Sequence, residues 1–202
     1  VYRWADDAAG WDPIVNPWSI DPTGGPTGAK ALKFDFFAPG LTGVLLKVGA
    51  SNIDATSYVT DSFSPGANRL ILAAVENTGT TDTPTLSGNG LTWVQVATVI
   101  TGVDRRLTLF RAMKPSPSSG AVTIAFGGLT QTGCAWSFVE FDGVSTAGAN
   151  GSGAVVQSGT NSAIDVTTLT VTLAAGFAAA RNATYIAVGH SANEAATPEV
   201  GY

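Results

Sequence analysis

The stretch of this chain that comes closest to a catalytic motif is Gly-His-Ser-Ala-Asn at residues 189–193. In the Gly-x-Ser-x-Gly turn, a strand ends in an exposed nucleophilic serine, and residues 185–188 have the pattern of such a strand. However, Asn193 replaces the last glycine, and a proline-containing tail follows instead of a helix. His190 is the only histidine and lies inside the motif, whereas a Ser-His-Asp triad needs its base at a distant position. The sequence therefore does not predict a hydrolase.

Acidic residues do not form a recognisable catalytic or metal-binding set. A glycosidase needs two carboxyl groups about 5 to 10 Å apart, and no pairing of the few glutamates can be read from the sequence. Glu140 stands between two apolar residues of a predicted strand, so we expect it to face away from them and to pair with an arginine or lysine. The aspartates at 6, 7, 12, 82 and 104 lack the spacing of an EF-hand loop. We expect a protein that is not an enzyme, with no catalytic residues, metal or cofactor.

Composition excludes two further classes of partner. Charged residues make up 12% of the chain, about half the usual fraction, while hydrophobic residues make up 45%. The net charge is −5 and the basic residues are scattered, so the patch that a nucleic-acid interface requires is missing. No apolar run approaches the roughly 20 residues of a membrane span. Cys134 is alone, so an internal disulfide is excluded, and we expect it to be a small buried side chain.

The elements that would position any site are predicted to be β-strands. Residues 91–100 alternate apolar and polar side chains and follow Asn89-Gly90, a dipeptide typical of hairpin turns. Variants of this unit recur with turn residues between them, at residues 57–63, 69–75, 106–111, 121–126, 135–141, 153–158, 169–173 and 184–190. Trp136, Phe138 and Phe141 do not share one face of a strand, which predicts a strand buried on both sides or a bulge. We therefore predict an all-β fold, an antiparallel sandwich or barrel, over residues 56–202.

Residues 1–55 are predicted to form an irregular arm, with short strands at 31–37 and 44–48. Prolines and Gly24-Gly25 interrupt this segment too often for a long helix. Trp4, Trp11 and Trp18 are spaced by seven residues, and we expect them to anchor the arm to a neighbouring surface. That surface belongs either to the same domain or to another subunit.

Several short motifs of the middle of the chain occur in an order that resembles a β-sandwich module of bacteriophage tail and virion proteins and of some secreted bacterial surface proteins. The motifs are Ser62 to Leu72 (SFSPGANRLIL), Pro84 to Gly88 with Leu91-Thr92-Trp93, Leu109 to Ala112, and Val139 to Val144 (VEFDGV). The resemblance covers roughly residues 56–200. It implies a structural or adhesive module with a jelly-roll-like β-sandwich and without catalytic residues. Such modules tend to continue beyond the point matching Tyr202, so it also implies a final strand that is missing here or supplied by a neighbour.

Two functions remain open at this stage. The first is a structural component of a virion or other extracellular assembly, whose partners are copies of itself and other structural proteins, held by the arm. The second is a carbohydrate-binding or receptor-binding module that recognises a surface glycan. Its aromatic platform would be formed by Trp11, Trp18 and Tyr58. The two differ in exposure, because a sugar platform faces solvent whereas a contact aromatic is covered by its partner. Either function places the protein on a virion or at the cell surface.

Overall fold

The computed structural model describes residues 3–4, 11–12, 41–164, 166–176 and 182–189 of the 202-residue chain. Every regular element in these ranges is a β-strand. The strands are β1 (Arg3–Trp4), β2 (Trp11–Asp12), β3 (Thr42–Ser51), β4 (Ser57–Val59), β5 (Leu70–Thr78), β6 (Thr85–Gly88), β7 (Val94–Thr101), β8 (Arg105–Ala112), β9 (Val122–Ala125) and β10 (Gly133–Asp142).

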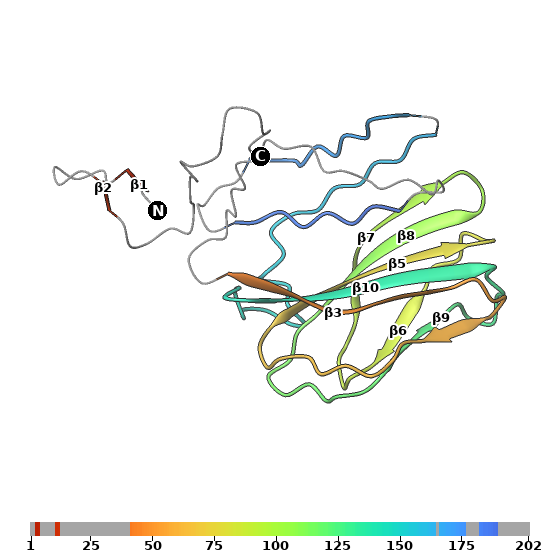
Figure 1. The fold of residues 1–202 in the computed structure, drawn as a ribbon, viewed down its shortest axis with the longest axis horizontal. Helices are drawn as coiled ribbons and strands as arrows, with labels where there is room; N and C mark the ends of the chain where they lie inside the picture. The colour runs from red at the N-terminus through yellow and green to blue at the C-terminus, as the bar shows by residue number, and fades with distance from the viewer. Residues whose placement is uncertain (1–2, 5–10, 13–40, 165, 177–181, 190–202) are drawn as a thin grey trace, which may run out of the picture.

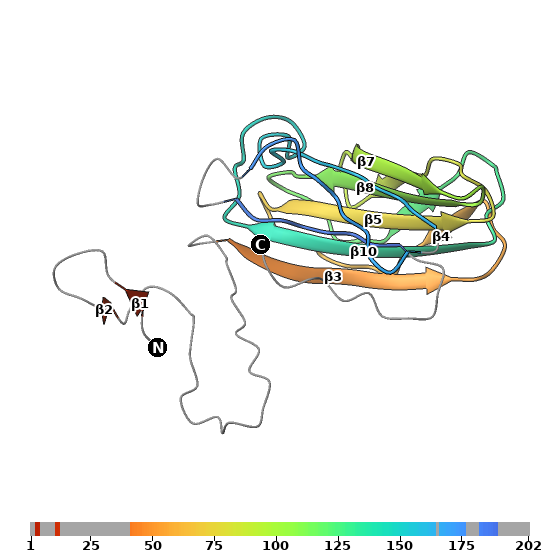
Figure 2. The same cartoon turned by 90° about the horizontal axis from the view of Figure 1, so that it is seen from above.

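Two antiparallel sheets form a sandwich (Figure 1). The larger sheet has the strand order β3-β10-β5-β8-β7, and the smaller has the order β4-β9-β6. The chain beyond β10 returns over the face of the larger sheet that points away from the smaller one (Figure 2). A separate short pair joins β1 to β2, with Trp4 opposite Trp11 in the register. The predicted all-β antiparallel sandwich is thus confirmed.

Strand β5 lies in the middle of the larger sheet and is buried on both faces, because the smaller sheet covers one face and the chain after β10 covers the other. Ile71, Ala73 and Val75 point into the sandwich, while Leu70 and Leu72 belong to a second cluster on the outer face. Side chains alternate between faces along a strand, so a centre strand covered on both sides reads as a continuous apolar run. The sequence Leu-Ile-Leu-Ala-Ala-Val of β5 has that pattern.

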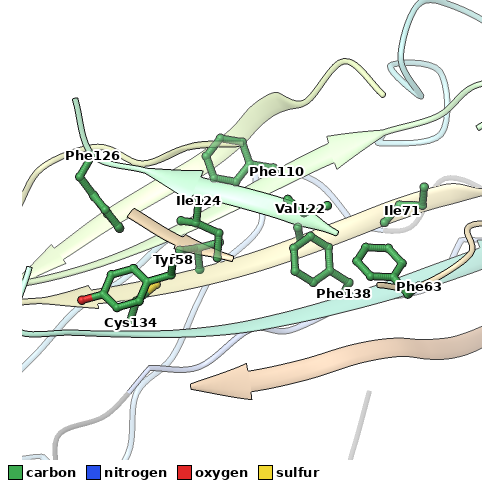
Figure 3. Packing of buried hydrophobic residues seen from close by; sticks show 11 residues of the cluster. Tyr58, Phe63, Ile71, Phe110, Val122, Ile124, Phe126, Cys134 and Phe138 are labelled. Carbon is green, nitrogen blue, oxygen red and sulfur yellow. The ribbon is translucent and has the colours of Figure 1, made fainter. Parts of the chain in front are cut away.

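Aromatic residues from both sheets fill the core between them (Figure 3). Phe138 of β10 is fully buried and lies 5.1 Å from Phe63 and 5.6 Å from Trp93, measured between ring centroids. Trp136 shares this inner face, whereas Phe141 packs on the outer face. The aromatic residues of β10 occupy both of its faces because the core covers one face and Tyr185 packs on Phe141 at the other. The sequence-based alternative of a strand covered on both faces is therefore correct for β10.

Three of the predicted strands are wrong for the residues that the structure describes. Residues 153–158, 169–173 and 184–189 run without strand pairing, although side chains 185–188 alternate between half-buried and exposed. Gln157 bonds to Ala175 through its side chain, with its Nε2 donating to the carbonyl oxygen at 2.7 Å. Alternation of apolar and polar side chains indicates which face of an extended segment is covered, but it does not ensure that another strand lies beside the segment to form backbone hydrogen bonds. The structure also contains a strand that the sequence analysis did not predict, β6, in which Ser87 and Gly88 pair with β9.

Strand β3 lies inside the range that the sequence analysis assigned to the arm, yet it pairs with β10 along nearly its whole length. The register shifts once, at Leu46, which is the extra residue of a bulge opposite Phe138 and Val139. The bulge places Leu45 and Val48 on the same outer face, opposite Val139 and Ser137. The larger sheet therefore includes residues that precede the predicted boundary at 56.

Candidate functional site

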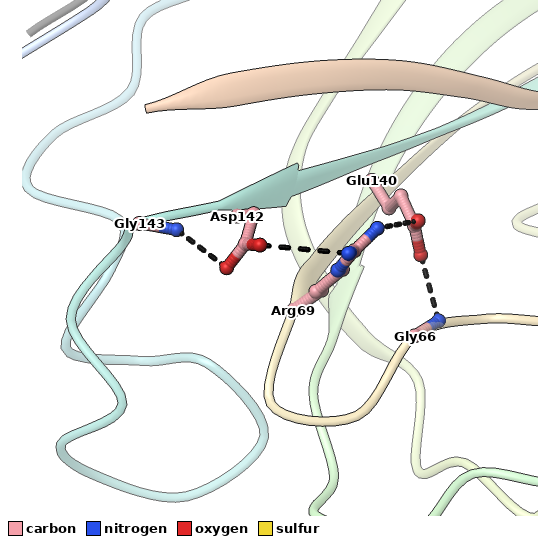
Figure 4. A network of polar contacts seen from close by, with 5 residues as sticks. All are labelled: Gly66, Arg69, Glu140, Asp142 and Gly143. Atoms are coloured by element: carbon pink, nitrogen blue, oxygen red, sulfur yellow. Dashed lines mark hydrogen bonds and ion pairs between the residues drawn. The ribbon is translucent and has the colours of Figure 1, made fainter. Parts of the chain in front are cut away.

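The residues of the elbow-like motif, His190 and Ser191, lie outside the described residues, as do Glu194 and Glu199. Among the acidic residues that the structure describes, Glu140, near the end of β10, is the most buried, and it belongs to a polar network (Figure 4). Its side chain is 6% exposed, and Arg69 Nη1 donates to Oε1 at 2.5 Å. This confirms that Glu140 faces away from its apolar neighbours and pairs with an arginine. The pairing partner comes from the loop before β5 rather than from a neighbouring strand.

The network around Arg69 holds a loop in place and does not resemble an acid–base pair. The backbone N–H of Gly66 donates to Glu140 Oε2 at 2.8 Å, and Arg69 also reaches Asp142 at 3.5 Å. The hydrogen bond and the charge of Glu140 raise the pKa of Arg69. A Cβ at Gly66 would lie 2.5 Å from Cδ of Arg69, so glycine leaves the space in which the arginine lies. Arg69 thus links the SFSPGANR and VEFDGV motifs, which are far apart in the sequence, at one end of the sandwich.

A second polar cluster is fully buried at the other end of β5. Asn77 and Gln131 are both inaccessible to solvent, and Asn77 Nδ2 donates to Gln131 Oε1 at 2.8 Å and to the carbonyl oxygen of Thr80 at 2.9 Å. Gln131 Nε2 in turn donates to Thr80 Oγ1 at 2.6 Å. Amide donors satisfy the oxygens of the loop after β5, which identifies the cluster as a loop support rather than a cation site. Asn89 acts in the same way, its Nδ2 contacting the carbonyl oxygens of Phe63 and Ser118 at 3.1 Å each.

A surface cavity of about 360 Å³ lies between the loops that contain Gly90, Lys114 and Asn150. The side chains of its lining include one ammonium group, two amides and two hydroxyls, but no aromatic ring. Lys114 Nζ donates to the carbonyl oxygen of Gly90 at 3.0 Å. The lining residues are Asn68, Gly90, Thr92, Met113, Lys114, Pro115, Thr146, Gly148, Ala149, Asn150 and Gly151. The cavity therefore lacks the ring on which a sugar would stack.

The structure corrects the assignment of Tyr58 to a glycan platform. Tyr58 is 5% exposed and packs against Phe126, with ring centroids 6.1 Å apart in an edge-to-face arrangement. Its hydroxyl donates to the carbonyl oxygens of Ile53 at 2.9 Å and Gln131 at 3.1 Å, and burial raises its pKa. A β-branched or aromatic residue in a strand reads the same whether it faces the core or solvent, so the sequence could not separate these roles. The side chains of Trp4, Trp11 and Trp18 lie outside the described residues.

The surface feature that sequence reasoning missed is apolar. On β3, Val44, Leu45 and Val48 are 47%, 59% and 62% exposed. The segment after β10 that covers the outer face of the larger sheet has apolar side chains on both of its own sides. Tyr185 packs on Phe141, while Ile186 and Val188 remain exposed. Further large apolar side chains are exposed on that segment, at Val156, Ile164, Val166, Leu169 and Val171. Exposed apolar surface of this extent is typical of a protein that contacts other proteins.

Neither the described residues nor the comparisons with known proteins assign a metal centre, a membrane helix or a family to this chain. In the described ranges, no three His, Cys, Asp or Glu side chains gather as a metal site would require. The same residues contain no helix that is long and apolar enough to cross a membrane. No protein-family model matches the chain, and no curated protein or solved structure matches it either.

Proposed function

We propose that this protein is a non-enzymatic structural component of an extracellular assembly such as a bacteriophage virion, where it associates with copies of itself and with other structural proteins. The observation that carries the proposal is the exposed apolar surface of β3 and of the segment after β10. A soluble protein with only 12% charged residues gains little repulsion between copies, so such a surface favours association. The virion or cell-surface location rests on the resemblance of the motifs that the Arg69 network joins.

The arm contributes to the proposed contacts through Trp4, Trp11 and Trp18. Each large aromatic contributes roughly 1.5–3 kcal/mol when it becomes buried, so three of them suffice to hold an extended segment on a partner. The alternative of a carbohydrate-binding module is less well supported, because Tyr58 is buried and the cavity near Lys114 has no aromatic ring in its lining.

Light scattering of the intact chain at micromolar concentration tests the proposal. We expect a discrete oligomer, and we expect the triple variant Trp4→Ala/Trp11→Ala/Trp18→Ala to have a lower mass. The arm should not be tested by deleting residues 1–55, since that deletion removes β3 from the larger sheet. A monomeric wild-type chain would refute the assembly role, and binding of the same chain to a glycan array would then favour the carbohydrate-binding alternative.

A further inference from the structure

We propose that the outer edge of β3 accepts residues 31–37 of a second copy of this chain as an additional antiparallel or parallel strand. This inference rests on the proposed assembly role and assigns to it an acceptor surface and a donor segment.

The first argument is that β3 is an edge strand with little protection. Within the described part of the chain it pairs with β10 alone, and it is ten residues long. The edge strands of the smaller sheet have only three and four residues, and the other long edge, β7, exposes a single large apolar side chain, Ile100. A long edge with exposed apolar residues is a template for pairing with another chain.

β3 carries a lysine, the residue type that often protects an edge strand, but the charge of this lysine is paired with an aspartate. A lysine on an edge strand discourages pairing when its charge projects freely. Lys47 is instead 27% exposed, and its Nζ is 2.5 Å from the carboxylate of Asp61. On the opposite face, the bulge at Leu46 brings Leu45 and Val48 together as an uncharged pair. An incoming strand would therefore meet apolar side chains on the outer face and no unpaired charge.

The second argument is the composition of the segment that precedes β3. Residues 31–37 read Ala-Leu-Lys-Phe-Asp-Phe-Phe, so Leu32, Phe34 and Phe36 would share one face of a strand. Aromatic and branched residues on adjacent strands form the most favourable cross-strand pairs. That face of the segment matches the outer face of β3, where Leu45 and Val48 are more than half exposed.

The third argument favours a second copy over the same chain. Leu41 is buried directly before β3, so a tight return onto the same edge would have to turn within Ala38-Pro39-Gly40. A two-residue loop of Pro39-Gly40 is a type II turn, whereas the twist of a hairpin favours types I′ and II′. A three-residue loop would place Pro39 at the third position of a type I turn, which proline disfavours. The segment is therefore better suited to the edge of a neighbouring copy.

The test compares full-length variants by light scattering at micromolar concentration. The edge variant is Leu45→Asp/Val48→Asp, and the strand variant is Phe34→Asp/Phe36→Asp. The control is Val103→Asp, at a site that is 90% exposed in the turn between β7 and β8. We expect each double variant to associate roughly ten-fold more weakly than the wild type or the control, because a charge replaces an apolar cross-strand contact.

Mixing the edge and strand variants in equal amounts distinguishes copies from a single chain. The intact segment of the edge variant can pair with the intact β3 of the strand variant, so the mixture should regain associated species. If both variants dissociate and mixing restores nothing, exchange between copies is refuted. If the wild type is oligomeric and neither variant changes its mass, the inference fails while the assembly role stands. A monomeric wild type refutes both.

Circular dichroism and thermal melting establish that each variant is folded. Should an aspartate variant fail to fold, Leu45→Thr/Val48→Thr and Phe34→Thr/Phe36→Thr replace it. Threonine keeps a high strand propensity while it removes most of the apolar contact, so the same mass comparison and the same mixing experiment decide the question.

Discussion

The stability of the fold is expected to depend on Cys134 at alkaline pH. This thiol is 4% exposed between the two sheets, and burial raises its pKa from 9.0 to about 12. Between these two values the folded chain keeps the proton while the unfolded chain loses it, so the unfolded state gains free energy of ionisation that the folded state does not. The free energy of unfolding therefore falls as the pH rises above 9, whereas below pH 9 ionisation of this thiol does not lower it.

The magnitude follows from the size of the pKa shift. Each pH unit in this window costs about 1.4 kcal/mol, so the loss is about 2 kcal/mol near pH 10.5 and at most about 4 kcal/mol by pH 12. Urea unfolding of the wild type and of Cys134→Ala, followed by tryptophan fluorescence from pH 7 to about 10.5, measures it. The variant carries a constant packing loss, so the difference between the two unfolding free energies should shrink as pH rises. Parallel pH profiles would refute the reasoning.

Two other predictions concern close packing and the loop network. A Cβ at Gly49 would lie 2.8 Å from the indole of Trp136, so Gly49→Ala should destabilise by about 1–3 kcal/mol. Gly176→Ala, where a Cβ meets nothing within 4 Å, should have little effect in the same urea titration. Glu140→Gln should cost about 2 kcal/mol, because the buried carboxylate accepts two hydrogen bonds, one from a charged donor. Asp142→Asn is the matched control, since that side chain is 55% exposed, and equal losses for both would contradict the assigned role of Glu140.

The sequence predicts the central part of the sandwich well because local pattern and tertiary position agree there. The continuous apolar run of β5, the alternation of β8 and the position of Glu140 each follow from which face is covered. Asn89 has a positive φ of 54°, as the predicted tight turn at Asn89-Gly90 requires. The turn does not close a hairpin, however, because it joins β6 of the smaller sheet to β7 of the larger sheet.

The remaining assignments could not be predicted because they depend on distant partners. A strand at residues 44–48 is predicted from the sequence, but its place in the larger sheet follows only from its pairing with β10, which is far away in the chain. Residues 184–189 have the alternating pattern of a strand, in which Tyr185 is covered and Ile186 is not, yet within the described ranges no neighbouring segment pairs with them. Burial of Tyr58 likewise depends on Phe126 and Trp136, which are far from it in the chain.

The place of β10 in the larger sheet has a consequence for synthesis on the ribosome. Among the described strands β10 is the last in chain order, yet it lies between β3 and β5, and β3 has no other strand partner in the described structure. Until Asp142 has left the ribosome, β3 cannot join the sheet through β10, even though it is translated earlier. Contacts between residues so distant in sequence form slowly. In a polysome, where several nascent copies lie close together, β3 remains accessible while the rest of the module is made, so the proposed pairing between copies would have its first opportunity before each copy has finished folding.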